Sequence, residues 1–110
     1  MTKVCFYRDR EGELTGFTAR DHAGYAEEGS DIVCAAVSAL VIHTVNAIEQ
    51  FTDDAYEGQQ DEQHTEIRFR IKGKPGEQAE LFLRALEATL TDMQNNRSYK
   101  DFIEVKYSEV

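Results

Sequence analysis

Cys34 stands where a thiol could act as a nucleophile. A long run with helical periodicity follows Asp31, and with Asp31 as the N-cap, Cys34 would be the third residue of the helix. The positive end of a helix dipole favours the thiolate and lowers the pKa below the ~8.5 of an ordinary cysteine. A thiolate at neutral pH is an available nucleophile, and unpaired backbone N–H groups in the same turn could bind a developing oxyanion. The expected position of Cys34 would therefore supply two parts of a thiol-hydrolase site, an activated nucleophile and donors for the oxyanion.

A thiol nucleophile needs a general base, and His22 is the histidine best placed to supply one. It precedes Cys34 by twelve residues, at the end of an expected strand, and a strand end and a helix start can converge. His43 follows Cys34 by nine residues, which at 100° per residue places it on the opposite face of the helix. His64 has no cysteine nearby, and the zinc-deaminase motif that His64-Thr65-Glu66 would begin lacks its Pro-Cys-x-x-Cys half.

Each of these residues also has an ordinary structural explanation. Cys34 borders an apolar helix face, and buried cysteines usually behave as small hydrophobic residues. His22 can be a solvated loop residue, Asp31 a plain helix cap, and Ser38 a helix-packing residue. Cys5, inside an expected strand, is expected in the core. A zinc site made of Cys5, Cys34 and His22 lacks the paired spacing of zinc ligands, so we expect no metal and no cofactor.

The hydrophobic pattern predicts the elements that must position these side chains. Alternating apolar residues predict strands at 3–8, 14–19, 66–72 and 102–107, with a short edge strand around Tyr56. Apolar residues at three- and four-residue spacing predict helices from Asp31 to about Phe51 and from about Ala79 to Met93. The stretch 20–30 has neither period and is predicted to be a loop.

The element order is therefore β-β-α-β-β-α-β. Strands separated by two amphipathic helices predict a two-layer α/β sandwich, a mixed or antiparallel sheet with both helices on one face. The chain has 110 residues, of which 41% are hydrophobic, enough for one core. We therefore expect a single domain over residues 1–110.

Charge and hydropathy limit the classes of partner that the chain is expected to bind. With 12 basic and 21 acidic residues the formal charge is −9, which argues against nucleic-acid binding and allows a basic partner. The run from Val33 to Ile42 is ten residues long, short of the ~18–20 that a membrane span needs. No signal peptide is apparent, and two cysteines without an export signal indicate reduced thiols. We expect a cytoplasmic protein that does not enter membranes.

The segment from His22 to Leu40, continued by Thr44-Val45-Asn46-Ala47-Ile48, resembles the signature of the bacterial ribosomal-processing cysteine protease family. The likeness is carried by His22-Ala23 and by Asp31-Ile32-Val33-Cys34-Ala35-Ala36-Val37-Ser38 at this separation. The element order and the length also resemble that family, so the similarity covers essentially the whole chain.

The resemblance implies a small cytosolic endopeptidase, usually a homodimer. Such enzymes remove a short N-terminal extension from the precursor of a large-subunit ribosomal protein, cutting after an aromatic residue. By this resemblance Cys34 would be the nucleophile and His22 the general base, while Asp31 and Ser38 would occupy positions that support the site. Ribosomal proteins are generally basic, so the negative charge of the chain fits the attraction of a cationic extension.

The loop between His22 and Cys34, which contains Gly24 and Gly29, would move to admit the substrate. Asp21 departs from the family, which typically has glycine before the histidine. If that position needs a positive φ, aspartate is among the less costly replacements; alternatively its carboxylate lies near His22 and favours the protonated imidazole. The alternative to a protease is a non-catalytic ribosome-assembly or binding module that grips a basic ribosomal segment.

Overall fold

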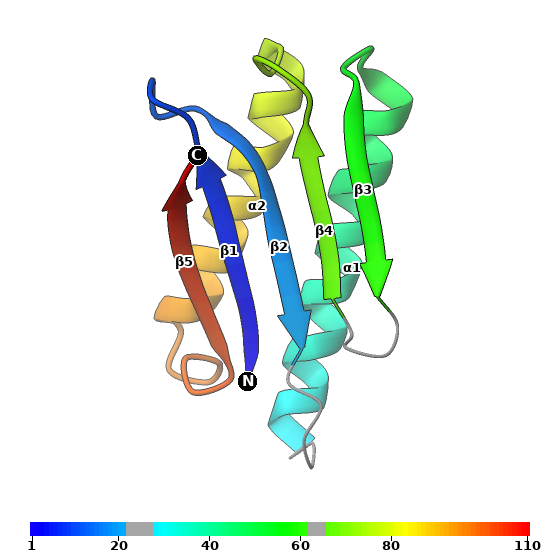
Figure 1. Cartoon of the computed structure of the whole chain (residues 1–110). Helices are drawn as coiled ribbons and strands as arrows, with labels where there is room; N and C mark the ends of the chain where they lie inside the picture. Colours follow the sequence, from blue (N-terminus) through cyan, green and yellow to red (C-terminus); the bar gives the residue numbers. More distant parts are fainter. Residues whose placement is uncertain (22–27, 62–65) are drawn as a thin grey trace.

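The structure, a computed structural model, describes residues 1–21, 28–61 and 66–110, with the side chains of residues 21 and 28–31 outside the description. The elements run in the order β1 (Thr2–Arg8), β2 (Leu14–Asp21), α1 (Glu28–Phe51), β3 (Tyr56–Asp61), β4 (Glu66–Ile71), α2 (Glu77–Asn95) and β5 (Ile103–Glu109) (Figure 1). The predicted order of strands and helices is confirmed, including the edge strand that begins at Tyr56.

The five strands form one mixed sheet in the order β3-β4-β2-β1-β5. β1 pairs in parallel with β5, and the other neighbours are antiparallel. Both helices cover the same face of the sheet and lie side by side (Figure 1). The predicted two-layer α/β sandwich is therefore confirmed, and the strand order is what the sequence pattern left open.

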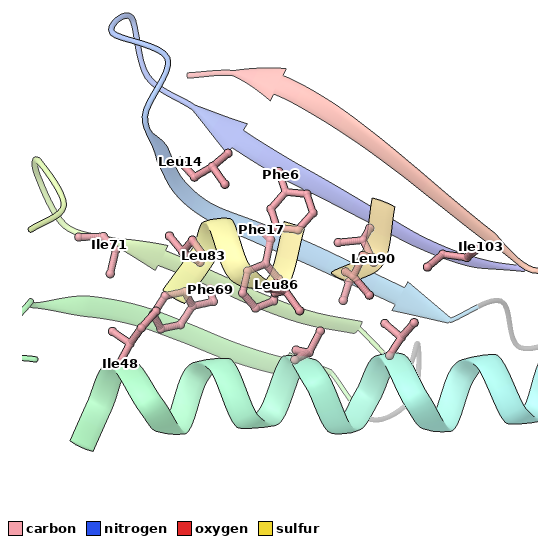
Figure 2. Close-up of a cluster of buried hydrophobic side chains, with 14 of the residues drawn as sticks. Phe6, Leu14, Phe17, Ile48, Phe69, Ile71, Leu83, Leu86, Leu90 and Ile103 are labelled. Atoms are coloured by element: carbon pink, nitrogen blue, oxygen red, sulfur yellow. The ribbon is translucent and has the colours of Figure 1, made fainter. Parts of the chain in front are cut away.

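The core fills the space between the sheet and the helices. Phe6, Phe17 and Phe69 lie opposite one another on three neighbouring strands and face the helices. Their ring centroids are 6.2 Å apart for Phe6 and Phe17 and 5.7 Å apart for Phe17 and Phe69. Figure 2 shows these three rings in one cluster with Ile48 of α1 and the leucines of α2. Leu83, Leu86 and Leu90 of α2 are buried there, as are Val33, Val37 and Val41 of α1.

The opposite face of the sheet, which no helix covers, is polar. Because side chains alternate along a strand, Val4 and Phe6 point toward the helices and Cys5 points away from them. The prediction that Cys5 belongs to the core is thus wrong, since it is half-buried on this open face. Its neighbours across the sheet are Thr18 of β2 and Lys106 of β5.

The helix α1 is more apolar than the ten-residue run in the sequence suggested. By length and composition alone, the stretch Ile32–Phe51 could span a membrane. One side of it, however, packs into the core, as is also common for core helices of water-soluble proteins. On the other side, Ile32 is 59% exposed and Ile42 is 50% exposed. The helix thus has an apolar outer face besides its buried one.

Candidate active site

Cys34 is the seventh residue of α1, because the helix begins at Glu28 and not at the expected Asp31. The assignment of Asp31 as the N-cap is therefore wrong, and Gly29 lies in the first helical turn and not in a loop. The added turn contains no apolar side chain that hydrophobic spacing could detect, although glutamate is favoured at a helix start by the dipole.

The longer helix changes how the Cys34 thiol would be activated. Dipole effects fall off beyond the first turn, and the unpaired N–H groups belong to that turn. Cys34 lies beyond the first turn and its backbone N–H is used within the helix, so it is not among the unpaired first-turn N–H groups that were expected to bind an oxyanion. Activation of this thiol must therefore depend more on a neighbouring base than on the helix itself.

The Cys34 side chain is half-buried and lies next to two fully buried residues of the same helix. Val33 and Val37 are 1% and 2% exposed and belong to the core. Cys34 lies on the flank of that buried stripe, and Ser38 lies on the same flank, also half-buried. The thiol is therefore packed on one side and accessible on the other, an environment that suits a nucleophile better than a core residue.

The zinc site considered from the sequence is excluded. Cys5 points to the open face of the sheet, whereas Cys34 belongs to a helix on the other face. The sheet separates the two thiols, so they cannot share one metal ion. Among the described residues, Asp9, Glu11 and Glu13 do bring their carboxylates together, in the hairpin at the far end of the molecule. There Asp9 accepts the backbone N–H groups of Glu11 and Glu13, which caps the turn.

The remaining predicted site residues are only partly within the description. His43 is exposed on α1, consistent with a face opposite to Cys34. Asp31 lies in α1, but its side chain is outside the described part of the chain. His22, Gly24 and His64 lie outside the described residues altogether. Their roles stay predictions.

The end of β2 leads to the proposed base. β2 ends at Asp21, directly before His22, and Figure 1 shows this end of β2 at the same end of the molecule as the start of α1. Thr2 of β1 stands opposite Asp21 in the register. The Thr2 hydroxyl is buried and, among the described residues, has no hydrogen-bond partner. The fold thus places the end of β2, which directly precedes His22, and the start of the helix that carries Cys34 at the same end of the molecule.

A carboxylate flanked by two guanidinium groups lies near the same strand end. Arg68 Nε donates to Glu66 Oε1 at 2.8 Å, and Arg20 Nη2 lies 3.4 Å from Glu66 Oε2. The hydrogen bond from Arg68, together with the charges of Arg68 and Arg20, lowers the pKa of Glu66 despite its burial. Glu66 is thus held ionised at neutral pH.

This ion-pair cluster predicts how stability depends on pH. Because the pKa of Glu66 is lower in the folded than in the unfolded chain, its contribution is present above the unfolded value and is lost as the pH falls through the folded value. We expect about 1 kcal/mol, since both arginines are more than half exposed and therefore screened. The free energy of unfolding, measured in urea, should fall less between pH 7 and pH 3.5 for Glu66→Gln than for the unaltered protein. Equal losses in the two proteins would contradict this assignment.

A surface hollow lined by described residues lies away from Cys34. Its volume is about 630 Å³, it lies between the β1–β2 hairpin and the segment after β4, and its lining includes Asp9, Arg70, Lys72 and Lys74. It is at the opposite end of the sheet from the start of α1 (Figure 1).

Comparisons of the sequence and of the structure with known proteins all point to the same family. The family described as "Cysteine protease Prp" matches residues 1–104. The ribosomal processing cysteine protease Prp of Staphylococcus aureus is 29% identical over 97 residues, which cover 88% of this chain and 90% of that protein. The crystal structure of Prp from S. aureus in complex with a substrate peptide is similar with a TM-score of 0.89 and 28% identity, over 98% of this chain and 100% of that one. SMU.848 from Streptococcus mutans is similar with a TM-score of 0.85 and 31% identity, over 100% and 99% of the two chains.

Proposed function

We propose, because this chain belongs to the cysteine protease Prp family, that it removes the N-terminal extension of a large-subunit ribosomal protein precursor. Family membership makes it a cysteine protease; the substrate and the residues of the dyad are our proposal. The observation that carries the proposal is the half-buried Cys34 on α1, the helix that begins at the same end of the molecule at which β2 ends.

In the proposed reaction, Cys34 Sγ attacks the scissile carbonyl carbon while the thiol proton passes to the imidazole of His22. The tetrahedral intermediate collapses to a thioester when His22 gives that proton to the leaving amine. Water then attacks the thioester, His22 accepts its proton, and the acid is released with the thiol restored. Asp31 and Ser38 support this pair of side chains, and the oxyanion is held by donors other than the amide of Cys34.

Charge supports a basic substrate. The chain carries a formal charge of −9, and a cationic ribosomal segment would be attracted to it over several ångströms at low ionic strength. A related protein, Prp of S. aureus, has been crystallised with a substrate peptide and with a covalently linked product peptide. We propose by this similarity that the present chain binds a comparable peptide in the cytoplasm.

The pH dependence of thiol alkylation tests the dyad. We expect Cys34 to react with iodoacetamide with a midpoint below the ~8.5 of an ordinary cysteine, and His22→Ala to return the midpoint to that value. A Cys5→Ala background removes the second thiol from the measurement. Cleavage of a peptide that spans the precursor junction is measured in parallel. An ordinary midpoint together with no cleavage would favour the non-catalytic binding module instead.

We further propose that the protein acts as a homodimer, through the outer face of α1. Ile32, Ala35, Ala39 and Ile42 are all exposed and follow the spacing of a helix–helix seam. The sequence from Ile32 to Ile48 contains no Asp, Glu, Lys or Arg. Contiguous exposed apolar side chains of this kind commonly mark protein interfaces. The second copy would place its own α1 against this face.

Charge inserted into that face should separate the subunits. We expect a mass of about 25 kDa, twice the 12.5 kDa of the chain, for the unaltered protein at micromolar concentration, and 12.5 kDa for Ile32→Glu, because the glutamate would lose its hydration in the interface. Leu81→Glu on α2 is the matched control, since Leu81 has the same 59% exposure as Ile32. Light scattering after gel filtration gives the mass. A monomeric unaltered protein would refute the dimer, and separation by Leu81→Glu would refute this interface.

A further inference from the structure

Glu66 is buried on a face of the sheet where its neighbours are exposed. Its side chain is 8% exposed, whereas Arg68 and Arg70 on the same strand and the same face are 59% and 57% exposed. The two guanidinium groups of Arg68 and Arg20 cover the carboxylate, one at each oxygen. Glu66 is thus a carboxylate that is nearly closed to solvent and is paired with a guanidinium group at each oxygen.

The same residue lies at the terminal rung of two strand ladders. Arg20 stands opposite Glu66 in the last pair between β2 and β4, and Asp61 stands opposite Glu66 in the last pair between β3 and β4. Strand ends open readily unless side chains tie them down. At this end β1 pairs with β2 through Asp21, and the contact between Arg20 and Glu66 adds a side-chain link to β4 on the other edge, two residues before His22.

We propose that Glu66 is a positioning residue which, through Arg20, fixes the point at which the chain leaves β2 toward His22. This inference rests on the proposed function, in which His22 takes the proton of Cys34. A general base must lie within hydrogen-bond reach of its proton donor, and a displacement of about 1 Å can cost about 100-fold in rate. A loosened end of β2 would therefore impair the proton transfer and leave Cys34 itself in place.

The chain offers a closely matched control. Glu57 of β3 lies on the same open face and pairs with an arginine of β4, as Glu66 does; Arg70 Nη2 is 3.3 Å from Glu57 Oε2. This pair is further along the sheet, four residues after Glu66 on β4. Glu57→Gln removes the same charge from the same face without touching the end of β2.

The experiment compares Glu66→Gln and Glu57→Gln in the Cys5→Ala background, using junction-peptide cleavage and the pH profile of Cys34 alkylation. We expect Glu66→Gln to lower kcat by about 10- to 100-fold with little change in KM, and to move the alkylation midpoint toward that of an ordinary thiol. Glu57→Gln should leave both unchanged. Arg20→Gln breaks the same link while Glu66 keeps Arg68, so it should reproduce the loss of kcat even if Glu66→Gln folds poorly.

Three results would overturn the proposal. One is a Glu66→Gln protein with unaltered kcat and alkylation profile. Another is an equal loss in Glu66→Gln and Glu57→Gln, which would indicate a general effect of charge on this face. A third is a folded Arg20→Gln protein with full activity. Failure of the proposed function itself is read separately, from an unmutated protein that neither cleaves the peptide nor has a lowered thiol midpoint.

Discussion

Cys34→Ala is expected to reduce kcat/KM for the precursor-junction peptide by about 10⁴-fold or more, because it removes the sulfur atom that forms the thioester in the proposed reaction. Whatever rate remains would come from binding and from groups that stabilise the transition state. Cleavage is followed by mass spectrometry of the two products. Because Cys34 is only half-buried, the free energy of unfolding should change by about 1 kcal/mol or less.

Cys5→Ala is the natural control for this variant. Cys5 is also a half-buried thiol, but it lies on the open face of the sheet, away from α1. It should retain full activity, which would separate the loss of a nucleophile from the loss of a thiol in general. Undiminished turnover by Cys34→Ala would eliminate covalent catalysis at this position. An equal loss of activity in both variants would indicate that the substitutions act by impairing folding.

The parts of the fold that hydrophobic spacing could predict are those with one buried and one open face. In β4, Phe69 and Ile71 are buried and alternate with exposed Arg68 and Arg70, which is the signal of a sheet with one wet face. The spacing of Leu83, Leu86 and Leu90 similarly identified α2. The predicted bounds of the four strands with alternating apolar residues agree with the structure to within two residues.

The features that were missed depend on contacts between distant residues. The first turn of α1 has no apolar residue to reveal it, so the helix was expected three residues late. Cys5 was assigned to the core by residue type, although its odd position relative to Val4 and Phe6 already placed it on the other face. The ion pair of Glu66 with Arg20 joins two strands, and no local pattern contains such a contact.

The candidate site was found by residue type and resemblance more than by geometry. The position of Cys34 in a helix near a strand end followed from the periodic pattern, and the structure confirms both elements. The predicted pairing of Cys34 with His22 is not decided by the described residues, since His22 lies outside them. The strand order that brings β2 beside β4, and thus Arg20 beside Glu66, could not be derived from local patterns either.

Gly16 of β2 lies where two strands approach too closely for a side chain. A Cβ atom added there would stand 2.2 Å from the carbonyl oxygen of Phe69 and 2.8 Å from the Cα atom of Arg70. Both are backbone atoms of β4, so neither can rotate away. Gly16 also follows the irregularity in the pairing of β1 with β2, between Tyr7 and Arg8. An isolated glycine within a strand often marks such a close backbone approach.

Gly16→Ala should therefore destabilise the protein by about 3 kcal/mol, because β2 and β4 must move apart and strain their shared hydrogen bonds. Gly58→Ala in β3 is the matched control: the nearest atoms to its added Cβ are 3.9 Å away, and we expect a change of less than about 1 kcal/mol. Urea unfolding followed by circular dichroism gives both free energies. Similar stabilities for the two variants would mean that β2 and β4 are not packed as closely as the structure has them. Because the pairing of β2 with β4 runs from Gly16 to Arg20, one residue before the end of β2, the strained variant should also lose cleavage activity, whereas Gly58→Ala should keep it.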